Sequence, residues 1–175
     1  MQPLTDVLGP WHEFYACLGT ASATMVGLLF VAATVGSGVF SGDRRAPLRV
    51  FLSASVVNFS LVLAACLTVL APVRDYRLFG GTVLAIALFG LGHALLACRD
   101  TIRDGMYARM DWEDRTWYLI FPALCYLSVA ATGVALALHL EAGCIALAIS
   151  SGLLVLVGIH NAWDITLWSM TRRQQ

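Results

Sequence analysis

The sequence predicts an all-α integral membrane protein, built as a bundle of five helices. Hydrophobic residues make up 59% of the chain and charged residues 13%. Soluble domains average roughly 45–50% apolar and about 25% charged residues. Five apolar runs each approach the roughly 20 residues that a helix needs to cross a hydrocarbon core of about 30 Å. Basic residues gather in alternate loops, as they do in multi-pass membrane proteins.

The five predicted spans are residues 14–40, 50–71, 79–98, 119–140 and 144–167, within a single transmembrane domain covering residues 1–175. No Lys or Arg precedes the first run, and it is too long for the apolar core of a signal peptide, so we expect it to remain as a membrane helix. Pro47 suits the start of the second helix, and Pro72 suits its end.

All eleven basic residues are Arg, and their distribution predicts the orientation. The first loop, the third loop and the C-terminal tail hold nine of them, whereas the second loop holds Arg74 and Arg77. The positive-inside rule therefore favours a protein with its N-terminus outside and its C-terminus in the cytoplasm. The formal net charge is zero, so electrostatics indicates no nucleic-acid partner.

The third loop, residues 99–118, has apolar side chains at Ile102, Met106 and Met110, which share one face of a helix. One interpretation is an amphipathic helix on the cytoplasmic membrane surface. The other is an extension of the third helix, followed by a turn at residues 112–115. The sequence does not decide between them.

The first span carries small residues four positions apart at Gly19, Ala23 and Gly27. Small residues let membrane helices approach closely, so we expect this stripe to pack against another helix. That helix belongs either to the same chain or to a second copy in a homo-oligomer.

Polar side chains inside the spans carry the functional signal, because such groups are costly in lipid and usually face a protein interior or a partner. At a rise of about 1.5 Å per residue, four helices bring a polar residue to a level roughly 4–7 Å to the cytoplasmic side of the midplane. The predicted layer consists of Asn58, His93, Tyr126 and His160, with Asn161 beside it and Asp164 at the cytoplasmic mouth.

Two interpretations of this layer remain open. His160 and Asp164 lie four residues apart on one helix face, where a carboxylate can orient an imidazole and favour its protonation. The pair could act with His93 as a protonatable pathway. Alternatively, these groups form hydrogen bonds between helices, which contribute about 0.6 kcal/mol on average in measured membrane cases.

The sequence predicts no enzyme, metal site or cofactor. No two histidines have the H-x-x-x-H or H-E-x-x-H spacing, and no serine lies in a G-x-S-x-G motif. The five cysteines lie in or at the ends of apolar runs without C-x-x-C spacing, so we expect them to be small buried hydrophobes.

Residues 11–15 (WHEFY), followed by 19–21 (GTA) and 27–32 (GLLFVA), resemble a group of small bacterial inner-membrane proteins. Residues 161–164 (NAWD) are similar to the same group, which has a basic residue where this chain has His160. Some members are labelled as modulators of a membrane-bound ATP-dependent protease. The resemblance implies a compact helical bundle in the bacterial inner membrane and supplies no established activity.

Two functions of different classes follow from these observations. The first is a small homo-oligomeric channel or transporter, with the polar layer as its pathway. The alternative is an accessory or scaffold subunit that modulates a larger membrane complex, such as a protease. A wetted cavity at the histidine level is expected of the first, and a closed interior with an exposed groove of small residues is expected of the second.

Overall fold

The computed structural model describes residues 3–39, 45–103, 105 and 110–171. Side chains are described for these residues except those in 35–53 and 165–171. Every regular element among these residues is helical, so the all-α prediction is confirmed. In chain order the elements are α1 (Leu4–Leu8), η1 (Gly9–Trp11), α2 (His12–Val39), α3 (Arg45–Leu70), α4 (Tyr76–Arg103), α5 (Trp112–Arg115), η3 (Thr116–Ile120), α6 (Phe121–Ala137) and α7 (Ala142–Thr171).

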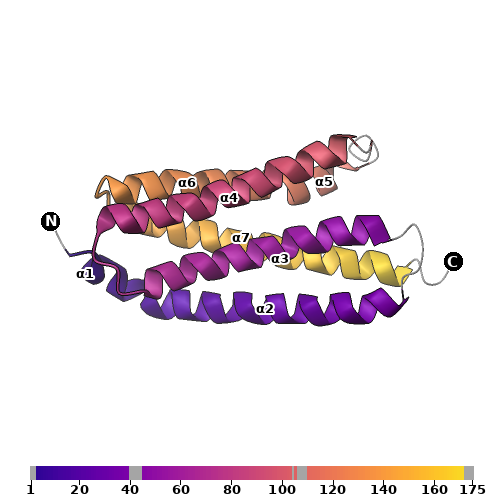
Figure 1. Cartoon of the computed structure of the whole chain (residues 1–175), viewed down its shortest axis with the longest axis horizontal. Coiled ribbons are helices and arrows are strands. Elements are labelled where there is room, and N and C mark those ends of the chain that lie inside the picture. Colours follow the sequence, from indigo (N-terminus) through magenta and orange to yellow (C-terminus); the bar gives the residue numbers. More distant parts are fainter. Residues whose placement is uncertain (1–2, 40–44, 104, 106–109, 172–175) are drawn as a thin grey trace.

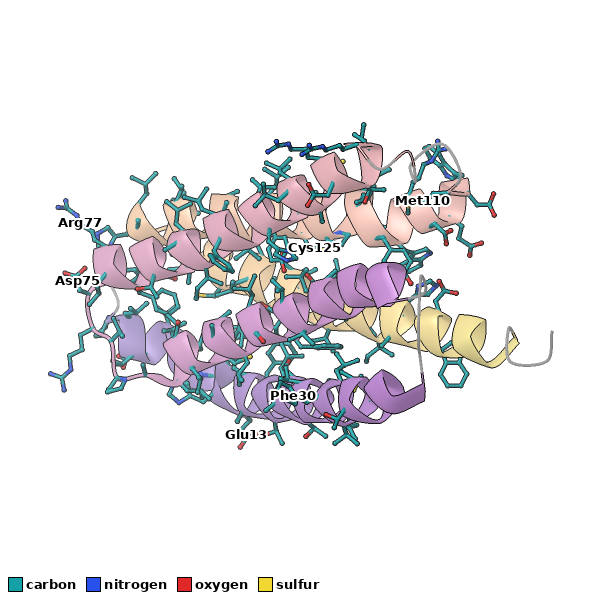
Figure 2. The ribbon with its side chains drawn as sticks, turned by 45° about the vertical axis from the view of Figure 1, so that its right-hand side comes forward. Glu13, Phe30, Asp75, Arg77, Met110 and Cys125 are labelled. Carbon is teal, nitrogen blue, oxygen red and sulfur yellow. The ribbon has the colours of Figure 1, made fainter. Side chains whose placement is uncertain are left out.

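The long helices run side by side along the length of the molecule and alternate in direction (Figure 1). α2 and α3 form one hairpin, α4 and α6 form another, and α7 packs against both α3 and α6. The two termini lie at opposite ends of the bundle. Figure 2 shows Asp75 and Arg77 at one end and Met110 at the other. The second loop and the described part of the third loop therefore lie at opposite ends of the molecule.

Among the described residues, four helical segments are long and apolar enough to cross a membrane: Leu4–Thr34, Tyr76–Arg103, Trp112–Ala137 and Ala142–Asp164. The described apolar part of α3, Ala54–Leu70, is shorter. Five helices thus fit the predicted bundle.

The helices extend past several predicted span boundaries, because backbone hydrogen bonding continues through polar residues that end an apolar run. α4 begins at Tyr76, where the Oδ1 atom of Asp75 accepts hydrogen bonds from the backbone N–H groups of Arg77 (2.7 Å) and Leu78 (2.9 Å). The predicted fourth span is displaced, since the helical segment already begins at Trp112 and ends at Ala137 rather than at residue 140.

The end of α6 is set by His139, which has a φ of 62°. The backbone N–H of His139 donates to the carbonyl of Leu136, and the N–H of Leu140 donates to that of Ala135. This is the Schellman arrangement that closes many helices, with His139 at the position usually held by glycine. The His139 ring contacts that of Tyr76, with 4.5 Å between centroids.

Part of the third loop is helical. Residues 99–103 continue α4, and α5 begins at Trp112, which fits the interpretation of an extended third helix. The alternative surface helix depends on Met106, which lies outside the described residues, while Ile102 is an exposed residue of α4.

α4 and α6 approach each other closely where two glycines face each other. A Cβ atom added to Gly80 would lie 2.5 Å from the carbonyl oxygen of Gly133, and one added to Gly133 would lie 2.8 Å from the backbone nitrogen of Leu84. Neither position can accept a side chain unless the two backbones separate. This contact holds the backbones of α4 and α6 close together within the hairpin.

The predicted stripe on the first span is divided between two environments. Gly19 packs within the chain, because a Cβ atom there would lie 3.1 Å from the Cβ of Cys66 on α3. Ala23 and Gly27 are exposed, and no atom lies within 4 Å of a Cβ built on Gly27. The stripe is therefore not one continuous seam inside the chain.

α7 lies at the centre of the interior. In its most apolar stretch 56% of the residues are buried, compared with 17% in the most apolar stretch of α4. Tyr15, Phe59, Phe79 and Tyr126 are among the largest fully buried side chains. The five cysteines are free thiols: Cys66, Cys125 and Cys144 are buried, Cys98 is half-buried, and Cys17 is exposed.

Candidate functional site

The site begins with Pro122, the second residue of α6. Proline has no backbone N–H, so it cannot donate to any carbonyl of the preceding turn. The N–H of Phe121 donates to the carbonyl of Thr116, which makes residues Thr116–Ile120 a π turn. The carbonyl of Trp117 consequently loses the donors four and five positions ahead, since Phe121 is engaged elsewhere and Pro122 has none.

Asn161 of α7 supplies the missing donor. Its Nδ2 atom donates a 3.3 Å hydrogen bond to the carbonyl oxygen of Trp117, across the boundary between two helices. The side chain is 1% exposed, which is unusual for an amide unless it is hydrogen-bonded. The buried asparagine of α7 is thus explained by an unpaired backbone group that a proline creates in α6.

Two further contacts join the same pair of segments. The Tyr118 hydroxyl lies 3.0 Å from Oδ2 of Asp164 and 3.2 Å from the carbonyl oxygen of Asn161, so its one proton is shared between two acceptors. The imidazole of His160 stacks on the indole of Trp117, with 4.0 Å between centroids and 12° between planes. We call these five residues, Trp117, Tyr118, His160, Asn161 and Asp164, the π-turn cluster.

Two buried atoms of the π-turn cluster have no hydrogen-bond partner within the described part of the chain: Nδ1 of His160 and Oδ1 of Asn161. The orientation of the Asn161 amide follows from its bond to Trp117, because a carbonyl accepts and only Nδ2 can donate. A buried polar atom without a partner costs about 1–3 kcal/mol. Hydrogen bonds therefore hold the π-turn cluster together, while the hydrogen-bonding capacity of two of its buried atoms is not used by the described residues.

A second polar contact lies deeper in the bundle. The Tyr126 hydroxyl donates a 2.6 Å hydrogen bond to Oδ1 of Asn58, which joins α6 to α3. The Tyr126 ring packs against the backbone of α4 at Gly90. His93 lies one turn further along α4 and is half-buried.

The predicted polar layer is therefore separated into two groups. Asn58 and Tyr126 contact each other directly, as expected of residues at one level. Asn161 and Asp164 instead contact the beginning of the α6 segment, and His160 stacks there too. The depth of each residue could be computed along its own helix, whereas the rotation of each helix, which selects the partner, could not.

A cavity beside Tyr126 measures about 10 Å³ and is lined by Leu61, Val62, Ala65, Ile86, Tyr126, Val129, Ser151 and Leu154. Roughly 10–15 Å³ is the minimum that holds one water molecule. This cavity is therefore no wider than a single-water void.

Serines within the spans include a pair that bridges two helices. The Ser128 and Ser150 hydroxyls lie 2.7 Å apart, and Ser150 donates to the carbonyl of Ala146. Across the ranges that the structure covers, no three His, Cys, Asp or Glu side chains are grouped so that they could hold a metal ion.

Comparison of the chain with protein-family models, curated proteins and solved structures finds no match. The resemblance of residues 11–15 and 161–164 to small inner-membrane proteins stays a prediction. Trp117, Tyr118 and Pro122 were not among the predicted site residues, although a proline just inside an apolar run is a visible sign of an unpaired carbonyl.

Proposed function

We propose that this chain is a multi-pass protein of the bacterial inner membrane, and that it serves as an accessory subunit packing against another membrane protein. One observation carries the proposal: polar side chains of the apolar helices are bonded to one another across helices, and the cavity described beside Tyr126 is no larger than one water molecule. The Tyr126–Asn58 and Tyr118–Asp164 contacts are the two clearest cases. Such bonds rigidify a bundle and define its shape.

The proposed orientation places the N-terminus outside and the C-terminus in the cytoplasm. Arg99 and Arg103 lie exposed near one end of the bundle, and Arg77 lies at the opposite end. The arginine-rich end corresponds to the cytoplasmic side by the positive-inside rule. Exposed Trp112 and Trp163 belong to segments at that end, and tryptophan is enriched at membrane interfaces.

The proposed contact surface is the exposed side of α2. Ala23 and Gly27 leave a shallow strip of small residues there, and Leu28, Phe30 and Val31 stand exposed next to it. Small residues allow a second helix to approach the backbone, and flanking large side chains give it area to pack on.

Site-specific photo-crosslinking in intact membranes tests this proposal. A photoreactive phenylalanine analogue is placed at Ala23, and the matched control carries it at Phe89, which is 65% exposed on α4. We expect a discrete protein adduct from position 23 and none from position 89. Lipid adducts alone, or the same protein adducts from both positions, would overturn the assignment.

A homo-oligomeric channel or transporter is the second candidate. The unpartnered buried atoms of His160 and Asn161, with Asp164 next to them, favour it, since unsatisfied polar groups can bind a passing ion or water. Ion flux into proteoliposomes is the measurement, with His93→Ala and His160→Ala as variants. Flux above that of empty vesicles, reduced in both variants, supports this function, and an adduct of two copies in the crosslinking experiment would agree with it.

A further inference from the structure

The beginning of the α6 segment is held to α7 by polar contacts of its own. Residues 112–120, which comprise α5 and η3 and which we call the docked segment, are attached to α7 by the π-turn cluster. The body of α6 is fixed to α4 through the close contact of Gly133 with Gly80. The body of α6 also packs on α7, where the Ser128 and Ser150 hydroxyls lie 2.7 Å apart, so the two parts of one helical segment are held by separate sets of contacts.

We propose that the docked segment is a latch, which swings away from α7 as a unit about the π turn before Pro122. Its opening uncovers Asn161 and Asp164 at the arginine-rich end of the bundle. The inference concerns a conformational device of this chain and does not depend on the proposed accessory function.

The hinge follows from the backbone hydrogen bonds. A continuous α-helix holds each turn to the next through i to i−4 bonds, and bending it breaks several of them. At the junction with α6, Pro122 donates nothing and the N–H of Phe121 is engaged with Thr116. Fewer ladder bonds therefore resist rotation here than anywhere inside α6, and a π turn is a recognised site of such bending.

The latch follows from the contacts that hold the segment closed. The bond from Asn161 to Trp117 is long, at 3.3 Å, and the Tyr118 proton is shared between two acceptors. In the part of the chain that the structure describes, closure also leaves Nδ1 of His160 and Oδ1 of Asn161 buried without hydrogen-bond partners. Opening would hydrate both atoms, so the open and closed states lie closer in free energy than they would for a fully satisfied contact.

The equilibrium between the closed and open states of the docked segment shifts when a ligand binds one of the two states more tightly. A partner or solute that engages the uncovered carboxylate of Asp164 would shift the population towards the open state, by the ratio of its affinities for the two states. The exposed Trp112 indole lies on the moving side, and its exposed surface of 73% leaves it accessible in the closed state.

Hydrogen exchange of the whole chain in lipid nanodiscs, read by mass spectrometry, tests the latch. Asn161→Leu removes the amide that holds Trp117. We expect amides of residues 112–120 to exchange roughly fivefold faster, the effect of losing one ordinary hydrogen bond, while residues 121–137 are unchanged. The matched control is Asn58→Leu, which removes a buried amide bonded to Tyr126 and should leave residues 112–120 unaffected.

Pro122→Ala provides the second variant, because it restores a backbone donor and allows a regular helix through the junction. In that background Trp117 can be satisfied within its own helix, so adding Asn161→Leu should accelerate exchange by less than twofold. The latch is refuted if Asn161→Leu leaves residues 112–120 protected as in the wild type, if it exposes residues 121–137 equally, or if Pro122→Ala fails to reduce its effect.

Discussion

The Tyr126 hydroxyl lies 2.6 Å from Oδ1 of Asn58, and this bond is the shortest polar link among the described contacts between helices. Tyr126→Phe removes the donor and leaves a buried carbonyl oxygen without it. We expect the free energy of unfolding in detergent to fall by about 1–3 kcal/mol. Denaturant titration followed by circular dichroism is the measurement.

A double-mutant cycle separates this bond from the loss of packing. Tyr126→Phe combined with Asn58→Leu should cost less than the sum of the single changes, because the second change removes the unpaired acceptor. Strict additivity would contradict a direct interaction between the two side chains.

The glycine pair between α4 and α6 predicts a sharp contrast between neighbouring positions. Gly80→Ala forces its new methyl group against the backbone of α6 and should destabilise the protein by about 1–3 kcal/mol, the usual cost of overpacking. Gly81→Ala has open space around it and should be neutral, or stabilising by up to about 1 kcal/mol, because alanine is the better helix former. Thermal unfolding of the two variants side by side provides the comparison; equal losses would contradict the close approach.

His139 closes α6 in a left-handed backbone conformation, which penalises most side chains. His139→Gly relieves that penalty and loses the contact with Tyr76, so we expect its midpoint of unfolding to remain near that of the wild type. His139→Val introduces a branch at Cβ in this left-handed conformation and should lower stability by roughly 1–2 kcal/mol relative to the glycine variant. A valine variant as stable as the glycine variant would argue against this backbone geometry.

Asp75 predicts how stability depends on pH at the end of the bundle where α4 begins. Backbone N–H groups of Leu78 and Arg77 donate to its carboxylate, and these bonds lower its pKa below the ordinary value. A carboxyl group with a lowered folded-state pKa stabilises the fold above its unfolded pKa of about 3.9, and that contribution disappears as the pH falls through the folded-state value.

Asp75→Asn is the matched variant, because asparagine also caps helices and does not titrate. We expect the wild type to lose more stability than the variant when the pH is lowered from 6 to 3. Thermal unfolding followed across that pH range is the measurement. Parallel curves for the two proteins would show that this carboxylate does not titrate with folding.

The helices were predictable from the sequence, because the hydropathy and the length of an apolar run are local properties. An apolar environment, whether lipid or a dry protein interior, favours a helix in such a run directly. The small-residue stripe shows where local reasoning ends. Gly19 and Gly27 are the same type of residue on the same face of α2. Gly19 nevertheless packs on Cys66, whereas a Cβ atom built on Gly27 has no atom within 4 Å. Their difference depends on the angle at which α2 crosses α3, and no residue of α2 encodes that angle alone.

The polar cluster was half predictable for a similar reason. The importance of Asn161 and Asp164 followed from their position in an apolar helix. Their partners did not, since Trp117 and Tyr118 lie 44 and 46 residues away from the atoms that they bind. Pro122 was the available clue, because its missing N–H requires some donor to complete the Trp117 carbonyl, and a buried amide is the side chain best suited to that task.

The central position of α7 has a consequence for how the protein folds during its synthesis on the ribosome. The helix against which both hairpins pack follows the other described helices in the chain, so it leaves the ribosome after them. Until it arrives, the α2–α3 and α4–α6 hairpins can contact each other through α3 and α4, while the faces of α3 and α6 that pack on α7 lack that partner. Packing of these five long helices is therefore a late event, completed when α7 enters between partners that are already in place.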